Sequence, residues 1–228
     1  MPDPGLLALW NDIEPGREAE YDRWHAREHV PERVSAPLFR SGRRYVDRAH
    51  ATHRYFTLYD VAEMVAFDTP EYRDLLQNPT PWSASMRPSF RNFLRAPCRL
   101  VGDAGVGLGA ALAVLRLPAD AAPGLDGLAA ADGMVRARLG YVAESQHHAG
   151  WQPPAPGADA AFAAVLLLEA LDRPAATAAF AAACAALCPR QDPVALGGVY
   201  DLASIFPGAD PAERLAHRRP GWPACPQP

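Results

Sequence analysis

The sequence predicts an α+β protein built from two tandem β-α-β-β-α-β units, the arrangement known as ferredoxin-like. Strand-like and helix-like segments follow one another in the same order twice along the 228 residues. The pattern Asp-x-Pro occurs at 68–70 and again at 172–174, each time after a strand-like run and at the start of a helix-like run. A glycine-rich stretch at 102–109 separates the halves. These observations predict two similar units of about 100 residues each.

The first unit, 1–104, is delimited by apolar runs and by helix breakers. Its predicted elements are a strand at 6–10, a helix at 21–33, strands at 43–46 and 55–61, a helix at 72–77 and a strand at 98–101. The first helix should end close to Pro31, because proline disfavours helical geometry in the residue before it. The two middle strands are aromatic and β-branched and are close enough in sequence to form a hairpin.

The second unit, 105–206, is predicted from the same order of elements. They are a strand at 111–117, a helix at 125–139, a short strand at 140–146, a strand at 161–168, an alanine-rich helix at 172–187 and a strand at 199–206. The proline-rich tail, 207–228, is expected to be extended or disordered. Gly105, Gly107 and Ala110 imitate a dinucleotide-binding fingerprint, but they lead into a strand, so we interpret them as a linker.

Composition excludes several classes of function. The formal net charge is −4 and no arginine-rich block stands out, so nucleic-acid binding is not expected. All 22 basic residues are arginine, which removes lysine Schiff-base chemistry, pyridoxal-phosphate linkage and the P-loop lysine. The four cysteines form no C-x-x-C pair. No run is long and apolar enough to span a bilayer and no signal peptide is recognised, so we expect a cytoplasmic protein without a membrane partner.

The segment 21–33 carries the most unusual face of the chain. On an α-helix, Tyr21, Trp24, His25, Glu28 and His29 fall within roughly 140° of arc. An ordinary amphipathic helix would place Leu, Ile, Val or Ala there. Histidine has its unperturbed pKa nearest neutrality, so such a cluster can hold and deliver protons. We interpret this face as the working face of a pocket.

Trp24, His29 and Pro31, placed in the first helix of a ferredoxin-like unit and followed by the Arg-Arg-Tyr strand at 43–45, resemble the dimeric α/β-barrel superfamily, nearest its EthD-like branch. The resemblance covers 6–102, and the second half matches in element order only. It implies that the two units pair their sheets as a barrel, with a pocket between each sheet and its own helices. It also implies small, often aromatic ligands and reactions such as isomerisation, elimination or cofactor-free oxygenation. One active pocket, in the first unit, is expected.

The leading hypothesis is a cofactor-independent lyase or isomerase acting on a small hydrophobic or aromatic carbonyl compound. His29 is the predicted general base or acid, His25 a second proton-transfer group, and Glu28 or Asp12 the group that orients His29 or relays its proton. Predicted substrate contacts come from the apolar wall and from a cation that balances an enolate or carboxylate. These residues are Trp24, Tyr59 and Trp82 for the wall and Arg44 for the cation.

Alternative functions stay open. A haem-binding or oxygen-using oxidoreductase would employ His25 or His29 as axial ligand. The order H-x-x-E-H is also that of an inverted zinc-peptidase motif, but a third ligand is missing from the pattern and no metal is predicted. A non-catalytic binding or scaffolding protein is the third possibility. His147 and His148 suit a surface or lid position, and a homodimer is possible.

Overall fold

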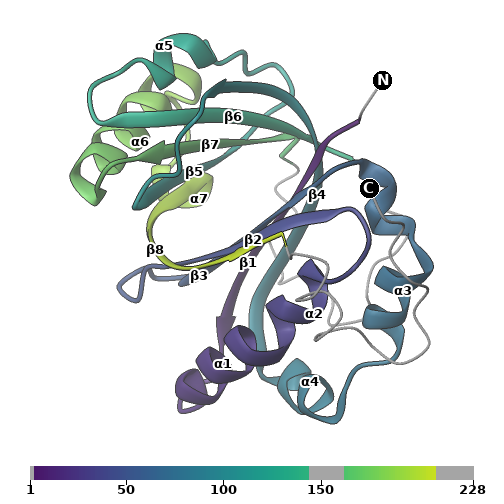
Figure 1. Cartoon of the computed structure of the whole chain (residues 1–228). Helices are drawn as coiled ribbons and strands as arrows, with labels where there is room; N and C mark the ends of the chain where they lie inside the picture. The colour runs from purple at the N-terminus through teal and green to yellow at the C-terminus, as the bar shows by residue number, and fades with distance from the viewer. Residues whose placement is uncertain (1–2, 144–161, 209–228) are drawn as a thin grey trace.

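The computed structural model describes residues 3–143 and 162–208, which form a closed antiparallel β-barrel flanked by helices (Figure 1). The strands are β1 (Gly5–Ile13), β2 (Phe39–Val46), β3 (Tyr55–Val61), β4 (Phe90–Gly105), β5 (Ala111–Leu117), β6 (Met134–Val142), β7 (Ala164–Ala170) and β8 (Gly197–Pro207). Around the barrel they follow the order β1-β3-β2-β8-β5-β7-β6-β4. His147 and His148 lie outside the described residues.

The strand order shows the internal repeat directly. Neighbouring strands of the first unit run β4-β1-β3-β2 and those of the second run β8-β5-β7-β6, which is the same ferredoxin-like order. The sheets are joined at two seams, where β2 pairs with β8 and β4 pairs with β6. The predicted α+β fold class with two paired units is therefore confirmed. The division after residue 104 stays a prediction.

Helices cover the outer face of each half of the barrel (Figure 1). The first unit carries α1 (Glu18–Trp24), the π-helical turn η1 (His25–His29), α2 (Val30–Val34), η2 (Met64–Asp68), α3 (Pro70–Gln77), α4 (Pro81–Met86) and η3 (Arg87–Ser89). The second carries α5 (Leu125–Ala129), α6 (Arg173–Leu187) and α7 (Pro193–Leu196). None of these described helices is long and apolar enough to cross a membrane.

Apolar side chains fill three layers, because successive residues of a strand face opposite sides of the sheet. The barrel interior is packed by residues such as Trp10, Phe56 and Val114. The outer faces bury a second layer under the first unit's helices and a third under α5, α6 and α7. Side chains on opposite faces of one strand therefore belong to different environments, and this separates the two polar sites described below.

The first helix is longer than predicted. Its α-helical geometry resumes after η1 and continues to Val34, so the predicted end near Pro31 is wrong. Pro31 has no N–H for the carbonyl of residue 27, and its ring would clash with that carbonyl in an α-helix. The wider π turn, in which the Val30 N–H donates to the His25 carbonyl, changes the register just before the proline. We attribute the continuation of the helix to this turn.

The predicted helix at 125–139 is also wrong beyond its first turn. α5 ends at Ala129, and Met134–Val142 forms β6. Arg136 and Arg138 alternate with apolar residues there, which is the periodicity of a strand. The usual pattern places polar side chains toward solvent, whereas these arginines point to the barrel interior. β4 begins at Phe90, eight residues before the strand predicted at 98–101, and α4 and α7 were not predicted. The other strands and α-helices overlap their predicted ranges, and Asp172 caps α6 and Thr69 caps α3.

Candidate functional site

The helix α1–η1–α2 presses His25 and His29 against the outer face of the first sheet. Both side chains are buried, with 2% and 5% of their surface exposed. Their rings stack on each other with centroids 5.3 Å apart. Tyr21 and Trp24 of α1 pack beside them, so the predicted gathering of aromatic rings and imidazoles on one face is observed.

His25 has one nitrogen bonded and one without a partner. Its Nε2 lies 3.2 Å from the Thr57 hydroxyl of β3, whereas its Nδ1 is buried without a hydrogen-bond partner among the described residues. Tyr59, two residues further along the same face of β3, likewise has a buried hydroxyl without a partner. A buried polar atom without a partner is unusual and marks a position where a ligand or proton transfer would be accommodated.

His29 is held in one tautomer by its neighbour on the next turn. Arg33 Nη1 lies 2.9 Å from His29 Nδ1 and 3.2 Å from the His29 carbonyl oxygen. Because a guanidinium can only donate, Nδ1 must be the accepting nitrogen, and the proton of the neutral ring resides on Nε2. His29 is therefore arranged as a hydrogen-bond or proton donor through Nε2.

Both imidazoles are uncharged near neutrality. Burial lowers the pKa of His25 well below its ordinary value, and the positive charges of Arg44 and Arg33 lower it further. Burial also lowers the pKa of His29, followed by the charges of Arg33 and of protonated His25. The desolvated ring cannot easily be charged, and adjacent cations oppose protonation as well.

The other two predicted catalytic residues are not placed beside the imidazoles' nitrogens. Glu28 accepts hydrogen bonds from the Trp24 indole and from the hydroxyls of Thr80 and Ser83, so it ties the first helix to α4. Asp12, on β1, accepts from the backbone N–H groups of 53 and 54 and from the Asn92 amide. Burial raises the pKa of Asp12, but these hydrogen bonds lower it more, so the net shift is downward. Asp12 is an ionised anchor for the β2–β3 loop.

The predicted substrate-contacting residues have several partners within the protein, and their contact with a substrate stays a prediction. Arg44 lies between the rings of Tyr21 and Tyr55, 4.7 and 4.9 Å from their centroids, and pairs with Asp22 at 2.7 Å. Trp82 donates its indole N–H to Glu20 at 3.3 Å. Trp24 lies 4.1 Å from the His29 ring, centroid to centroid, and Tyr59 is fully buried. Two of them have a buried polar atom without a hydrogen-bond partner among the described residues, the hydroxyl of Tyr59 and the Nε of Arg44.

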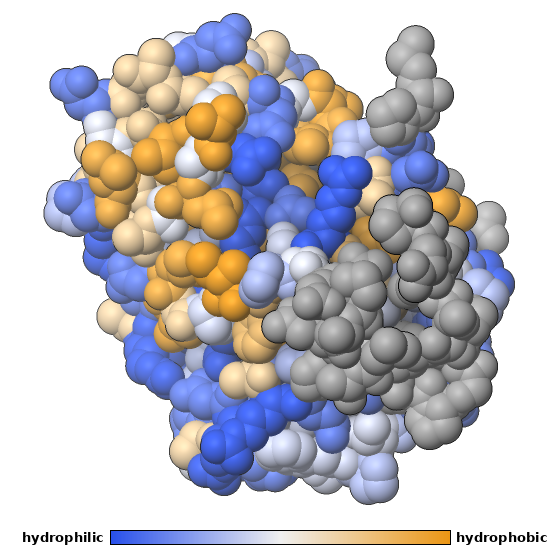
Figure 2. Space-filling model, in the orientation of Figure 1, coloured by the Kyte–Doolittle hydropathy of each residue, from blue (hydrophilic) through white to orange (hydrophobic). Residues whose placement is uncertain are grey.

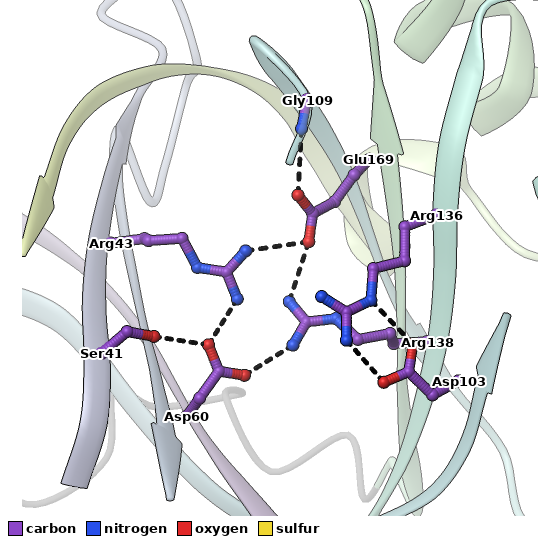
Figure 3. A network of polar contacts seen from close by, with 8 residues as sticks. All are labelled: Ser41, Arg43, Asp60, Asp103, Gly109, Arg136, Arg138 and Glu169. Atoms are coloured by element: carbon purple, nitrogen blue, oxygen red, sulfur yellow. Dashed lines mark hydrogen bonds and ion pairs between the residues drawn. The ribbon is translucent and has the colours of Figure 1, made fainter. Parts of the chain in front are cut away.

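A second polar cluster lies inside the barrel and was not predicted. Arg43, Asp60, Arg138 and Glu169 form a closed ring of ion pairs, which we call the charge ring (Figure 3). Its four N···O distances are 2.6, 2.9, 2.6 and 3.0 Å. Burial alone would raise the pKa of Asp60, but Arg138 and Arg43 lower it to about 2. The backbone N–H of Gly109 donates to the second oxygen of Glu169.

The charge ring repeats between the two units. Arg43 of β2 pairs in register with Leu58 of β3, two residues before Asp60. Arg138 of β6 pairs with Leu167 of β7, two residues before Glu169. Each unit therefore contributes one arginine and one acid at equivalent positions. The sequence signal was Arg-Arg or Arg-x-Arg within one strand and an acid near the end of the next strand. It was missed because 134–139 was assigned to a helix.

The described cavity at this end of the barrel lies over the charge ring and is not at the histidines. Arg43 and Asp60 line it, whereas Thr57 and Tyr59 lie on the opposite face of β3. The histidine layer is therefore closed, whereas the charged end of the barrel is open. Among the described residues, aromatic and imidazole rings fill the space between the first sheet and its helices, where the pocket was expected.

The side chains around the imidazoles do not fit a haem group. An axial histidine must present a nitrogen to a space that admits the porphyrin. The ring centroids of Tyr21, His29 and Trp24 lie 5.4, 5.3 and 6.2 Å from that of His25, which leaves no such space between these residues. Within the described ranges, no group of three or more His, Cys, Asp and Glu side chains is placed to hold a metal ion.

Comparison with known proteins bears on the fold. No protein-family model and no curated protein matches the sequence. Among solved structures, a proposed chlorite dismutase matches with a TM-score of 0.55 at 13% identity, covering 90% of this chain and 96% of that one. A proposed monooxygenase from Fusobacterium nucleatum subsp. nucleatum matches with a TM-score of 0.53 at 10% identity, covering 90% and 94%. An anthrone oxidase-like protein matches at 0.52 and 7% identity, covering 91% and 94%.

The fold is that of a ferredoxin-like α/β barrel. These neighbours cover nearly the whole chain, so the likeness extends over both units and the closed barrel. At such identities it concerns the fold alone. The barrel part of the predicted resemblance is therefore confirmed, whereas the EthD-like branch stays a prediction.

Proposed function

We propose that the chain is an enzyme that moves protons on a small hydrophobic or aromatic carbonyl compound without a resident cofactor, as a lyase or isomerase. The observation that carries the proposal is the buried, uncharged His25, whose Nδ1 has no partner, stacked on His29, whose Nε2 carries the proton. When the His25 proton is on Nε2, where it donates to the Thr57 hydroxyl, His25 Nδ1 is the base and His29 Nε2–H is the acid that such a reaction needs.

In this reaction His25 Nδ1 accepts a proton from the carbon next to the carbonyl group, and the electron pair of that C–H bond forms the enolate. His29 Nε2–H donates to the enolate oxygen or returns a proton at a second position. The positive charges of Arg33 and Arg44, which lower the pKa of both imidazoles, stabilise the negative charge of the enolate. The aromatic rings of Tyr21 and Trp24 exclude water from the layer.

Contact with a substrate requires the first helix to move away from the sheet, because both imidazoles are buried. The π turn is the natural point for such movement, since its hydrogen bonds span five residues and are less favourable than those of an α-helix. Opening at η1 would expose both histidines together, because both belong to that turn.

A second candidate is oxidation of the same kind of compound by molecular oxygen, and the fold neighbours favour it, since one is described as a monooxygenase and another as anthrone oxidase-like. The first step would be the same proton abstraction by His25. The carbanion would then form a C–O bond with O₂, and the peroxide would take up the abstracted proton to give a hydroperoxide. Removal of the second proton from the same carbon and cleavage of the O–O bond release water and leave a carbonyl group, so O₂ is the oxidant. The two candidates differ in whether oxygen is consumed.

The test uses anthrone and simple aryl ketones as probes. Exchange of the protons next to the carbonyl for deuterium is followed by NMR in D₂O, with and without oxygen. The His25→Gln variant should lower the protein-catalysed exchange by about 10²-fold or more, because the base is lost. The matched control is His50→Gln, a histidine that stacks on Tyr200 away from the layer. Exchange by the wild type no faster than in buffer, or equal exchange by His25→Gln, would refute the proposal.

Several further properties expected from the sequence stay predictions. These are the EthD-like branch, the cytoplasmic location, a homodimer, the absence of a cofactor, and the division into 1–104, 105–206 and the tail 207–228. The proton-transfer proposal includes the absence of a cofactor and depends on none of the others.

A further inference from the structure

A cavity of about 440 Å³ opens at the end of the barrel, above the charge ring. Strands β1, β2, β5 and β6 begin around this opening, and β3, β4, β7 and β8 end there. Figure 2 shows hydrophilic and hydrophobic surface side by side at the centre of the face where β4 and β8 lie in Figure 1. The volume is within the range of pockets that hold small molecules, about 300–1,000 Å³. We call this cavity and its lining the barrel mouth.

The barrel mouth has an excess of positive charge. Its arginines are Arg40, Arg43, Arg136 and Arg138. Asp60 and Asp103 also line it, and Glu169 of the charge ring lies beneath. Among residues 3–143 and 162–208, four guanidinium groups thus face three carboxylates, which leaves one positive charge uncompensated by these residues. Such an excess beside a low-dielectric interior attracts an anion more strongly than an exposed arginine does.

The uncompensated cation is Arg40 on the rim. Arg136 is held by Asp103 through two hydrogen bonds of 2.7 and 2.6 Å, and Arg43 and Arg138 are held by the charge ring. Arg40 is exposed and forms no ion pair with a described residue. The floor adds two more donors, because the Nε atoms of Arg43 and Arg138 are buried and have no hydrogen-bond partner in the part of the chain that the structure describes. Buried donors of this kind normally have an acceptor.

The rim is also apolar. Leu108 and Ile205 line the cavity while 53% and 43% of their surfaces are exposed, which is high for such large side chains. Leu100 completes this side of the lining. Exposed apolar groups beside a few convergent charged groups are typical of a site that binds a molecule with both characters.

We propose that the barrel mouth binds a small organic monoanion, a carboxylate carried on an apolar chain or ring. The carboxylate lies against Arg40 and the arginines of the floor, and the hydrocarbon lies against Leu108 and Ile205. A monoanion matches the single excess charge. The site is independent of the proton-transfer proposal, because it lies on the other face of β3 from His25.

Isothermal titration calorimetry on the full chain tests this site with hexanoate and benzoate. Hexan-1-ol is the probe that lacks the negative charge, and inorganic phosphate is the probe that lacks the apolar part. The carboxylates should bind with a Kd of about 1 mM or tighter, and hexan-1-ol and phosphate at least about tenfold more weakly. Raising NaCl from about 50 to 500 mM should weaken carboxylate binding, because salt screens the rim charge.

Two kinds of rim variant locate the binding. Arg40→Gln should weaken hexanoate binding by about fivefold or more, and Arg40→Glu further, because a bound carboxylate loses its charged partner. Leu108→Ser should weaken hexanoate binding but leave the salt dependence intact. The matched control is Arg190→Gln, another exposed arginine without an ion pair to a described residue. His25→Gln should bind as the wild type does, which separates this site from the proton-transfer layer.

The proposal is overturned if neither carboxylate binds at about 10 mM, a concentration at which a 1 mM site would be about nine-tenths filled. It is also overturned if the Arg40 and Leu108 variants bind like the wild type, since binding would then occur elsewhere. Equal binding of phosphate and hexanoate would show charge attraction alone and contradict the amphiphilic ligand.

Discussion

His25 and His29 show how burial sets the chemistry of a single side chain. Both would be partly charged near pH 6.5 in an unfolded chain, yet in the folded chain both have a pKa well below that value. Their stacked rings and the cations of Arg33 and Arg44 keep the layer uncharged. An imidazole in this state is available as a base over a wide range of pH, although its proton affinity is low.

The buried histidines should make stability depend on pH. Below about pH 6.5 the unfolded state binds a proton at each histidine and the folded state does not, so the free energy of unfolding falls as pH falls. The slope from two such groups is about 2.7 kcal/mol per pH unit. Urea unfolding from pH 7 to 5 should show this loss in the wild type. The His25→Gln/His29→Gln double variant should show a clearly smaller slope, and an equal slope would contradict uncharged burial.

The sequence predicted which residues lie together on one helix, but it did not predict contacts between residues that are distant in the sequence. Tyr21, Trp24, His25 and His29 were found because helical spacing fixes which residues share a face. The hydrogen bonds of Glu28 were missed, because its partners Thr80 and Ser83 are more than 50 residues away. The hydrogen bonds of Asp12 to Asn92 and to the backbone of the β2–β3 loop were missed for the same reason. Long-range hydrogen bonds leave no periodic signal.

The position of the first helix depends on Gly42 of β2. A Cβ atom there would lie 2.7 Å from Val30, 3.0 Å from Tyr59 and 3.1 Å from Val34. The glycine thus allows α2 to approach the sheet closely, and this sets the height of η1 above β3. A larger residue must displace the helix that carries both histidines.

Gly42→Ala should therefore destabilise the fold by about 1–3 kcal/mol, as overpacking does in a filled core. The matched control is Gly127→Ala in α5, where a Cβ would meet nothing within 4 Å. This control should be neutral or stabilising by up to about 1 kcal/mol, because alanine favours a helix. Thermal and urea unfolding measure both. Equal stability of Gly42→Ala and the wild type would show that α2 does not pack as described.

Element prediction succeeded where apolar periodicity was plain and failed where charges face inward. β3 and β5 lie at the predicted residues because their runs are aromatic or apolar. β6 was assigned to a helix, because Arg136 and Arg138 occupy interior positions that a pattern would assign to solvent. The π turn was not predictable from the sequence. Pro31 can either end a helix or follow a widened turn inside one, and the neighbouring residues do not show which of the two occurs.

At the scale of the whole molecule, the charge ring joins the two units inside the barrel. Arg43 and Glu169 are 126 residues apart in sequence and are both nearly inaccessible to solvent. Removing one partner of a buried ion pair leaves a charge without compensation. A substitution that removes one member of the charge ring is therefore expected to destabilise the closed barrel as well.

Glu169→Gln should lower the free energy of unfolding by about 3–5 kcal/mol, because two buried arginines would share one remaining acid. Arg48→Gln is the control, since Arg48 pairs with Asp22 at the surface with 59% of its side chain exposed, and such pairs contribute about 0–1 kcal/mol. Chemical unfolding of both variants is the measurement. Similar stabilities for the two variants would show that the ring is not a structural tie.

The charge ring also sets an acid limit. Because the folded pKa of Asp60 is about 2, below its unfolded value, its stabilisation is complete above about pH 4 and is lost as pH falls through 2. Acid unfolding should therefore have a component from Asp60 between about pH 4 and 2, separate from the histidine component at higher pH. Asp60→Asn should remove the lower component and leave the upper one.

The repeated order of elements was enough to predict two paired units, but the barrel mouth was not predictable. The cavity and its charge exist only when β2 meets β8 and β4 meets β6, and those seams bring together residues from both units. The alternation of polar and apolar residues indicates which face of a sheet a residue occupies. It does not indicate which strands pair to close the barrel.

The measurement that tests the central claim most directly is ¹⁵N NMR of the histidine side chains in the wild type. We expect His25 and His29 to be neutral at pH 6.5, where a free imidazole would be half charged, and His29 to have its proton on Nε2, because Arg33 occupies Nδ1. The signals can be assigned with the single His→Gln variants. Imidazolium shifts for either residue near pH 6.5, or a proton on His29 Nδ1, would contradict the proposed base and acid.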